Sequence, residues 1–169
     1  MIVTLEVPDH LRFQLVYRLE RSTPFGSLPN SGPKFEFFAG SPTGLAAFRT
    51  LAGVFGLPGA VKATAKLATP RRHLYVLRNE SRVVSYGWGT IGKCGYYKIE
   101  HDAVVIGPIW THPESRGQGL ATVSLQAAID RWISHGRRLF YIDTERDNIP
   151  AQKVFARCGF GKPIALYMR

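Results

Sequence analysis

Cysteine is scarce in this sequence, and long apolar runs are missing. Cys94 and Cys158 form no CxxC pair, which excludes a disulfide framework and gives no indication of a zinc or other metal site. No apolar stretch approaches the roughly 20 residues that cross a bilayer, so no membrane association is expected. Residues 1–13 lack the basic region and apolar core of a secretory signal, so we expect a cytoplasmic protein.

Acidic residues are also few. The sequence holds 22 Lys and Arg against 12 Asp and Glu, a formal net charge of +10. Such an excess attracts anionic partners: nucleic acid, a polyphosphorylated cofactor or an acidic acceptor. The basic residues are scattered, however, and the densest groups are pairs such as Arg71-Arg72 and Arg137-Arg138. The charge pattern therefore makes nucleic acid an unlikely partner class.

Length and periodicity predict one mixed α/β domain. The chain has 169 residues, 45% of them hydrophobic, no internal repeat, and enough length to bury a core. Residues 22–44, rich in Ser, Pro and Gly, predict a long loop or two connected turns. The apolar patterns predict strands at 1–7, 11–19, 73–78, 82–90, 103–111, 138–144 and 164–168, and helices at 43–55, 59–68, 120–135 and 148–158.

Gly107 and Pro108 interrupt the predicted strand at 103–111. Proline cannot donate to a sheet, and both residues are disfavoured in central strands. We therefore expect a bulge or a local departure of the strand from its neighbour at this point.

The stretch THPESRGQGLAT, Thr111 to Thr122, joins that strand to the following helix. A helix N-terminus carries unpaired N–H groups, and glycines let a ligand approach the backbone closely. The stretch is not a Walker A loop, because it lacks the GK[ST] ending, nor a dinucleotide fingerprint, because Thr122 stands where a third glycine is needed. By itself the stretch favours an ordinary turn over an anion site.

Residues 103–160 resemble the GNAT acetyltransferase superfamily. Arg116-Gly117-Gln118-Gly119-Leu120-Ala121 matches its acetyl-CoA signature [Q/R]-x-x-G-x-[G/A]. The later stretch DNIPAQKVFARCGF is similar to another block of that superfamily, with Asn148, Ala151, Gly159 and Phe160 in register. The two motifs also stand in the spacing that the superfamily shows.

The resemblance implies a fold and a ligand. We expect an α/β (α+β mixed) domain with a central mixed, mostly antiparallel sheet, flanking helices and a V-shaped splay between the strands ending near Thr111 and Thr144. Residues 1–169 form a single domain, with 1–70 as the variable acceptor side and 71–169 as the CoA-binding core. The implied contacts to acetyl-CoA come from Ile109, Trp110, Thr111, Arg116, Gly117, Gln118, Gly119, Leu120, Ala121, Thr122, Asn148 and Phe155.

The implied reaction is direct transfer of an acetyl group from acetyl-CoA to a primary amine of a small molecule. Because the chain is basic, an acceptor that carries phosphate or carboxylate is favoured over a polyamine. The alternatives are a non-catalytic acyl-CoA-binding or sensing module, a protein N-acetyltransferase, and a basic nucleic-acid-binding domain.

Phe155 stands where the superfamily often has a tyrosine general acid. Tyr167, Tyr141 or a water molecule then protonates the leaving thiolate, or the thiolate leaves unassisted, since thiols have a pKa near ~8.5. The alternatives are a binding module that does not turn over and a Phe155 that only packs against the pantetheine; we favour retained activity without a dedicated tyrosine acid.

The sequence does not single out one residue as the general base. Glu100, His101 and Asp102 precede the strand on which some relatives carry a catalytic carboxylate, but the matching position is Ala103. Asp102 and Glu100 are the candidates, together with the simpler interpretation of a solvated strand end.

The C-terminus is short. Relatives usually have two strands after the Gly-Phe pair, whereas nine residues follow Phe160 here. We therefore expect the N-terminal hairpin or a second subunit, as in a homodimer, to complete the sheet.

Overall fold

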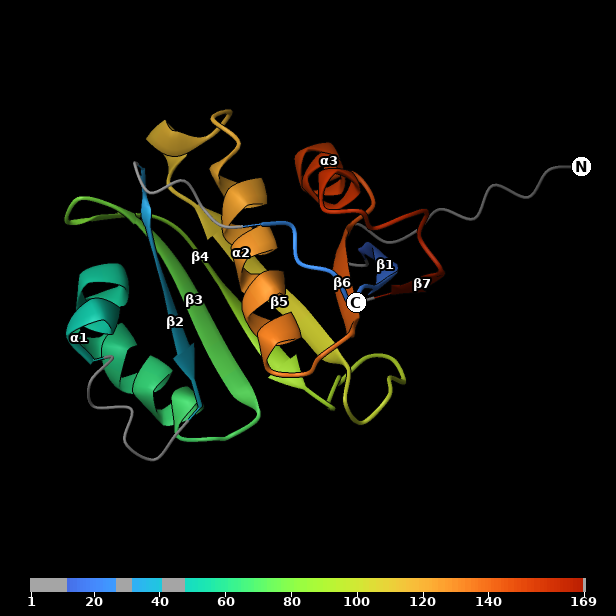
Figure 1. The fold of residues 1–169 in the computed structure, drawn as a ribbon, viewed down its shortest axis with the longest axis horizontal. Coiled ribbons are helices and arrows are strands. Elements are labelled where there is room, and N and C mark those ends of the chain that lie inside the picture. The colour runs from blue at the N-terminus through green and yellow to red at the C-terminus, as the bar shows by residue number, and fades with distance from the viewer. Residues whose placement is uncertain (1–11, 27–31, 41–47, 169) are drawn as a thin grey trace, which may run out of the picture.

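The computed structural model describes residues 12–26, 32–40 and 48–168, and this part of the chain folds around one seven-stranded sheet (Figure 1). The strand order is β2-β3-β4-β5-β6-β1-β7. The elements are β1 (Phe13–Glu20), β2 (Lys34–Ala39), α1 (Phe48–Leu67), β3 (Arg72–Asn79), β4 (Arg82–Ile91), β5 (Val104–Thr111), the 3-10 turn η2 (Pro113–Ser115), α2 (Leu120–Ser134), β6 (Leu139–Glu145), α3 (Ile149–Arg157) and β7 (Ala165–Met168).

Every strand pair in the sheet is antiparallel except β5 with β6. These two strands are parallel because α2 carries the chain back along the sheet between them, as a parallel connection requires. The sheet is therefore mixed and mostly antiparallel, which confirms the predicted fold class.

Helices cover both faces of the sheet. Neighbouring strand residues point to opposite faces, and on β3 Tyr75 packs in the cluster of α2 while Leu74 and Val76 pack in the cluster of α1. Trp132 of α2 and Leu51 of α1 are fully buried. Figure 1 shows α2 lying along β5 and α3 beside β6. The face that holds α1 carries a third cluster, with Val16, Ala103 and Tyr141 at its centre.

The break predicted at Gly107-Pro108 separates β5 from β6. The β4–β5 register shifts between Gly87 and Gly89, opposite this point. The β5–β6 pairing covers Val104 to Ile106 and stops there, although β5 continues to Thr111 and β6 to Glu145. The strands therefore diverge toward their carboxyl ends, as the predicted V-shaped splay requires.

One expectation for the first half of the chain needs correction. Residues 34–39 form the edge strand β2, not a loop, because Phe35, Phe37 and Phe38 pack against the two cores. The surrounding Ser, Pro and Gly residues had favoured a loop. The two predicted helices are both present: the span α1 consists of two helical segments that meet at Gly56, whose φ of 67° and ψ of 173° are not helical. The predicted strand at 1–7 and the helix start at 43–47 lie outside the described residues.

β1 completes the sheet within a single chain. It lies between β6 and β7, antiparallel to both, and buries Val16, Tyr17 and Leu19. The sequence left two sources for the strand missing at the short C-terminus, an N-terminal segment or a second subunit. The N-terminal segment supplies it.

Candidate active site

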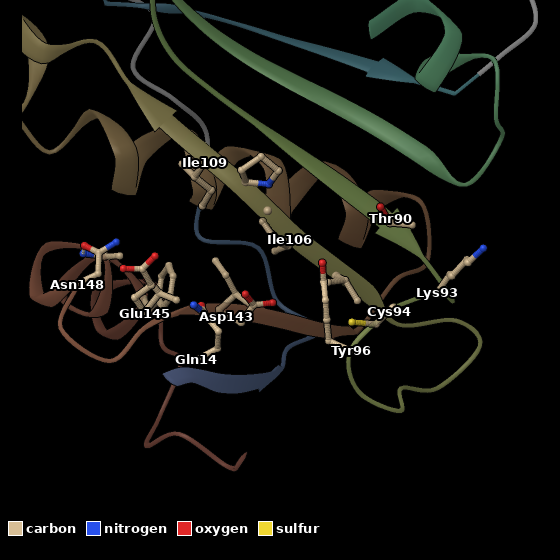
Figure 2. A pocket seen from close by; sticks show the side chains of 18 of the residues that line it. Gln14, Thr90, Lys93, Cys94, Tyr96, Ile106, Ile109, Asp143, Glu145 and Asn148 are labelled. Atoms are coloured by element: carbon tan, nitrogen blue, oxygen red, sulfur yellow. Dashed lines mark hydrogen bonds between the residues drawn. The ribbon is translucent and has the colours of Figure 1, made fainter. Parts of the chain in front are cut away.

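A cleft of about 1380 Å³ opens where β5 and β6 diverge (Figure 2). Gly107, Pro108 and Ile109 form one wall. The other wall comes from Ile142–Glu145 on β6, with Asn148, Ala151 and Phe155 at the start of α3 and within it. The cleft therefore follows the break in the sheet, which gives it two strand walls.

The β5 wall offers free backbone groups. On the β4 side, Ile109 pairs with Gly87, Trp110 with Tyr86 and Thr111 with Ser85. On the other side, β6 has no pairing with β5 beyond Ile106. The N–H and C=O groups that point toward β6 are thus available for a ligand with amide groups, which can add to the edge as a strand does.

The turn after β5 is braced by side chains. His112 Nδ1 accepts a hydrogen bond from the N–H of Glu114 at 3.3 Å, and Arg82 donates to Glu114 Oε2 at 2.7 Å while contacting the His112 ring. Gln118 Nε2 donates to the carbonyl of Glu114 at 3.2 Å. Arg82 also holds the pKa of Glu114 below its usual value through this hydrogen bond and its charge. The turn is therefore ordered before any ligand binds.

The N-terminus of α2 follows this turn with exposed donors. Gly117 and Gly119 both have φ 76°, a left-handed conformation that side chains rarely adopt, and space beside both is open. Gly119 is the N-cap and supplies no side-chain acceptor to the first turn. Thr122 Oγ1 is buried and has no hydrogen-bond partner among the described residues. Together with the helix dipole, these groups suit an anion.

Arg116 stands beside these donors. Its side chain is exposed, and Nε donates to the carbonyl of Thr111 at 3.4 Å, the last residue of β5. The guanidinium is thereby tied to the end of the β5 wall and adds a positive charge next to Gly117 and Gly119.

Asn148 and Phe155 lie on the facing wall, as the sequence motif implied. Asn148 is the N-cap of α3 and its Oδ1 accepts from the N–H of Ala151 at 3.2 Å, so its amide NH₂ is directed elsewhere. Phe155 is 4% exposed and packs edge-on against Tyr17, with ring centroids 5.4 Å apart. This residue is part of the core as well as of the cleft lining.

Asp143 is a cleft carboxylate that sequence reasoning missed. Its side chain lies on the β6 face opposite α2, lines the cleft, and accepts a hydrogen bond from the Tyr97 hydroxyl at 3.0 Å. Burial and the Asp143 carboxylate raise the pKa of Tyr97, so this hydroxyl stays protonated. An acidic residue within the apolar strand at 138–144 was the available signal, but the fold of residues 92–102 that brings Tyr97 to it was not predictable.

The acid and base candidates from the sequence lie elsewhere. Glu100 accepts from the Tyr141 hydroxyl at 2.8 Å, and Asp102 is exposed in the turn before β5. Tyr167 stacks on Tyr96 with centroids 5.5 Å apart. Of these residues, Tyr96 lines the cleft while Glu100, Asp102 and Tyr167 do not.

Residues 55–160 match the sequence model of the acetyltransferase (GNAT) family, which is more than half of the chain. The chain belongs to this family. A comparison with curated proteins gives no match.

Solved GNAT structures share the fold. The aminoglycoside N-acetyltransferase AAC(6')-Iy, in a structure with CoA, aligns with a TM-score of 0.57 and 20% identity over 82% of this chain and 95% of its own. The same enzyme with a bisubstrate analogue, CoA-S-monomethyl-acetylneamine, gives a TM-score of 0.60 and 19% identity over 80% and 95%. A GCN5-related N-acetyltransferase from Sphaerobacter thermophilus gives 0.62 and 17% over 94% of this chain and 50% of its own.

The described residues contain neither a candidate membrane span nor a candidate metal site. None of their helices is both long and apolar enough to span a bilayer. They also bring together no group of three or more His, Cys, Asp or Glu side chains that could hold a metal ion.

Proposed function

We propose that this protein is an acetyl-CoA-dependent N-acetyltransferase that transfers an acetyl group directly to a primary amine of a small molecule. The observation that carries the proposal is the braced turn and donor-rich N-terminus of α2, which stand at the end of an open strand edge. The CoA complexes of AAC(6')-Iy, which has the same fold, support this ligand.

The residues of the cleft, together with the turn and the α2 N-terminus that follow β5 and do not line the cleft, fit acetyl-CoA. Backbone N–H groups from Gly117 to Ala121, with Arg116 and the unpartnered Thr122 hydroxyl, would hold the pyrophosphate. The free edge of Ile109–Thr111 and the amide of Asn148 would bind the pantetheine arm from two sides. When bound, acetyl-CoA supplies an acyl carbon activated as a thioester.

Asp143 is placed to accept the proton of the amine. A protonated amine is not a nucleophile, so transfer requires a base within the cleft. The reaction forms a C–N bond, breaks the C–S bond and releases this proton. The hydrogen bond from Tyr97 fixes one carboxylate oxygen of Asp143 and leaves the other for the amine. Backbone N–H groups of the β5 edge would stabilise the negative charge that develops on the carbonyl oxygen.

Phe155 cannot protonate the thiolate, and we propose that it shapes the cleft instead. Its contact with Tyr17 and its place in the core make it a wall residue. Since a thiol has a pKa near ~8.5, a thiolate can leave and take its proton from water.

We also propose a single functional domain, with residues 71–169 supplying the contacts to acetyl-CoA and residues 1–70 contributing mainly to the acceptor side. β1 crosses this division because it pairs with β6 next to the cleft.

Calorimetry of CoA binding combined with thiol release tests the proposal. Arg116→Ala with Gly119→Asp removes a charged donor and adds a negative charge at the α2 N-terminus, so CoA affinity should fall about 100-fold or more, since hydrogen bonds to charged groups contribute about 1.5–3 kcal/mol each. Arg49→Ala, an exposed arginine of α1, is the matched control. Equal CoA affinity in wild type and double variant would refute the phosphate site.

The same experiment separates a binding module from an enzyme. Tight CoA binding without thiol release for any amine in a broad panel would favour the non-catalytic alternative that Phe155 suggests.

A further inference from the structure

The cleft continues past Asp143 to a basic end. Thr69, Arg71 and Arg72 line it from the segment that leads into β3, and Thr90 and Lys93 line it from the end of β4 and beyond. Figure 2 shows Asp143 between two ends of the cleft, with Asn148 near one and Thr90 and Lys93 near the other. The basic end is therefore opposite to the end at which Asn148 is proposed to bind the pantetheine arm.

The sheet register places this basic end on the same face as Asp143. Arg72 pairs with Thr90, Thr90 with Val105 and Val105 with Tyr141, so these residues form a row across four strands. His73, the neighbour of Arg72, bonds to Trp132 of α2, so Arg72 faces the other side of the sheet. Asp143 is the next residue after Tyr141 on that face of β6.

The cations at this end have no ion-pair partner in the part of the chain that the structure describes. Arg12, Arg78 and Arg82 form ion pairs with Glu145, Glu36 and Glu114. Among the described residues, by contrast, no carboxylate forms an ion pair with Arg71, Arg72 or Lys93. Three cations that line a cavity beside two threonine hydroxyls are suited to a phosphate, for which arginine offers bidentate hydrogen bonds.

We infer that the acceptor is an amine that also carries a phosphate, held by Arg71, Arg72 and Lys93 while its amino group lies at Asp143. The inference rests on the proposed function. Strands lie about 4.8 Å apart, so the backbones of Arg72 and Tyr141 are separated by roughly 14 Å. The amine and the phosphate of the acceptor are therefore several bonds apart, farther than in 2-aminoethyl phosphate.

A matched series of amines tests this inference. The probes are 6-aminohexanol, 6-aminohexanoate, 6-aminohexyl phosphate and the short 2-aminoethyl phosphate, each with acetyl-CoA. We expect kcat/KM to be highest for 6-aminohexyl phosphate and about 10- to 100-fold lower for the uncharged alcohol, the range expected for losing one hydrogen bond between charged groups.

Two double variants with the same loss of charge assign the effect to residues. Arg71→Gln with Arg72→Gln should abolish the preference for the phosphate while leaving CoA affinity and kcat/KM for 6-aminohexanol close to wild type. Arg49→Gln with Lys62→Gln, on the exposed surface of α1, should leave the preference unchanged. Lys93→Gln should reduce it partially.

A binding measurement tests the anion subsite even if turnover is slow. Calorimetry of 6-aminohexyl phosphate with the CoA-saturated protein should show binding in wild type and its loss in Arg71→Gln with Arg72→Gln. Equal kcat/KM for the alcohol and the phosphate, or equal phosphate binding by both proteins, would overturn the anion subsite while acetyl transfer stands. Failure to bind CoA at all would instead overturn the proposed function.

Discussion

Asp143 is held in the cleft by the alternation of its strand and by one hydrogen bond. The alternation of β6 turns it away from the buried Ile142 and Thr144, and the Tyr97 hydroxyl holds one of its oxygens at 3.0 Å. The partner comes from a connection that lies far away in the sequence. A carboxylate fixed in this way can receive a proton without first having to reorganise.

Asp143→Asn should lower kcat by about 100- to 10,000-fold, the range for removal of a general base, and leave CoA affinity unchanged. Tyr97→Phe should lower kcat less, because the carboxylate is kept but loses its orientation. Steady-state kinetics with calorimetry of CoA binding would measure both. Glu100→Gln is the informative comparison, because Glu100 also accepts from a tyrosine but does not line the cleft. If that variant loses activity and Asp143→Asn keeps it, the base is Glu100.

At the level of elements, α2 is fixed to the sheet through a buried polar contact. Trp132 Nε1–H donates to His73 Nδ1 at 2.7 Å, and the two rings stack with centroids 6.3 Å apart. Gly89 makes this approach possible, because a Cβ there would lie 2.2 Å from the Trp132 ring. The N-terminus of α2 is thus positioned beside the end of β5 by packing at its other end.

This contact predicts a pH dependence of stability. Burial, and then the nearby charges of His135 and Arg137, lower the pKa of His73 to about 4. Between pH 6.5 and 4 the unfolded chain takes up a proton at His73 that the folded chain does not, so stability present above pH 6.5 is lost as the pH falls. The loss approaches about 3 kcal/mol, at 1.36 kcal/mol per pKa unit.

Denaturant unfolding of wild type and His73→Asn at pH 7 and pH 4.5 measures this effect. An asparagine oxygen keeps an acceptor for Trp132 but does not titrate, so the variant should lose less stability over the same interval. Identical losses in the two proteins would show that other groups account for the acid sensitivity.

The elements differ in how well the sequence predicts them. The turn from Thr111 to Gly119 and the helices α2 and α3 were predictable, because glycines, an N-cap Asn148 and local periodicity define them within a few residues. β2 was not predictable, because its apolar residues form a strand through contacts with core residues that are distant in the sequence. The pairing of Tyr97 with Asp143 depends on the path of a whole connection, and no local pattern encodes that path.

At the scale of the whole molecule, the net charge of +10 acts on a ligand before contact. Opposite charges attract over a Debye length, which shortens from about 10 Å at 0.1 M salt to about 3 Å at 1 M. The protein should attract acetyl-CoA through its phosphates. Acetyl-pantetheine, which carries no phosphate, should not be attracted in this way.

We therefore expect KM for acetyl-CoA to rise by about 3- to 10-fold between 0.1 and 1 M NaCl, as attraction between the protein and the cosubstrate is screened. KM for acetyl-pantetheine should change little over the same range. Initial rates of thiol release give both values. A parallel rise for the two thioesters would point to a general effect of salt on the protein instead.

The position of β1 has a consequence for how the chain is made. β1 is synthesised before the other strands of the sheet, but the two strands that flank it, β6 and β7, are synthesised after all the others. Val16 and Tyr17, which are buried on opposite faces of the sheet, lack their packing partners on β6 and α3 until then. Pairings so distant in the chain slow folding, so the cleft can form only after β6 has been synthesised.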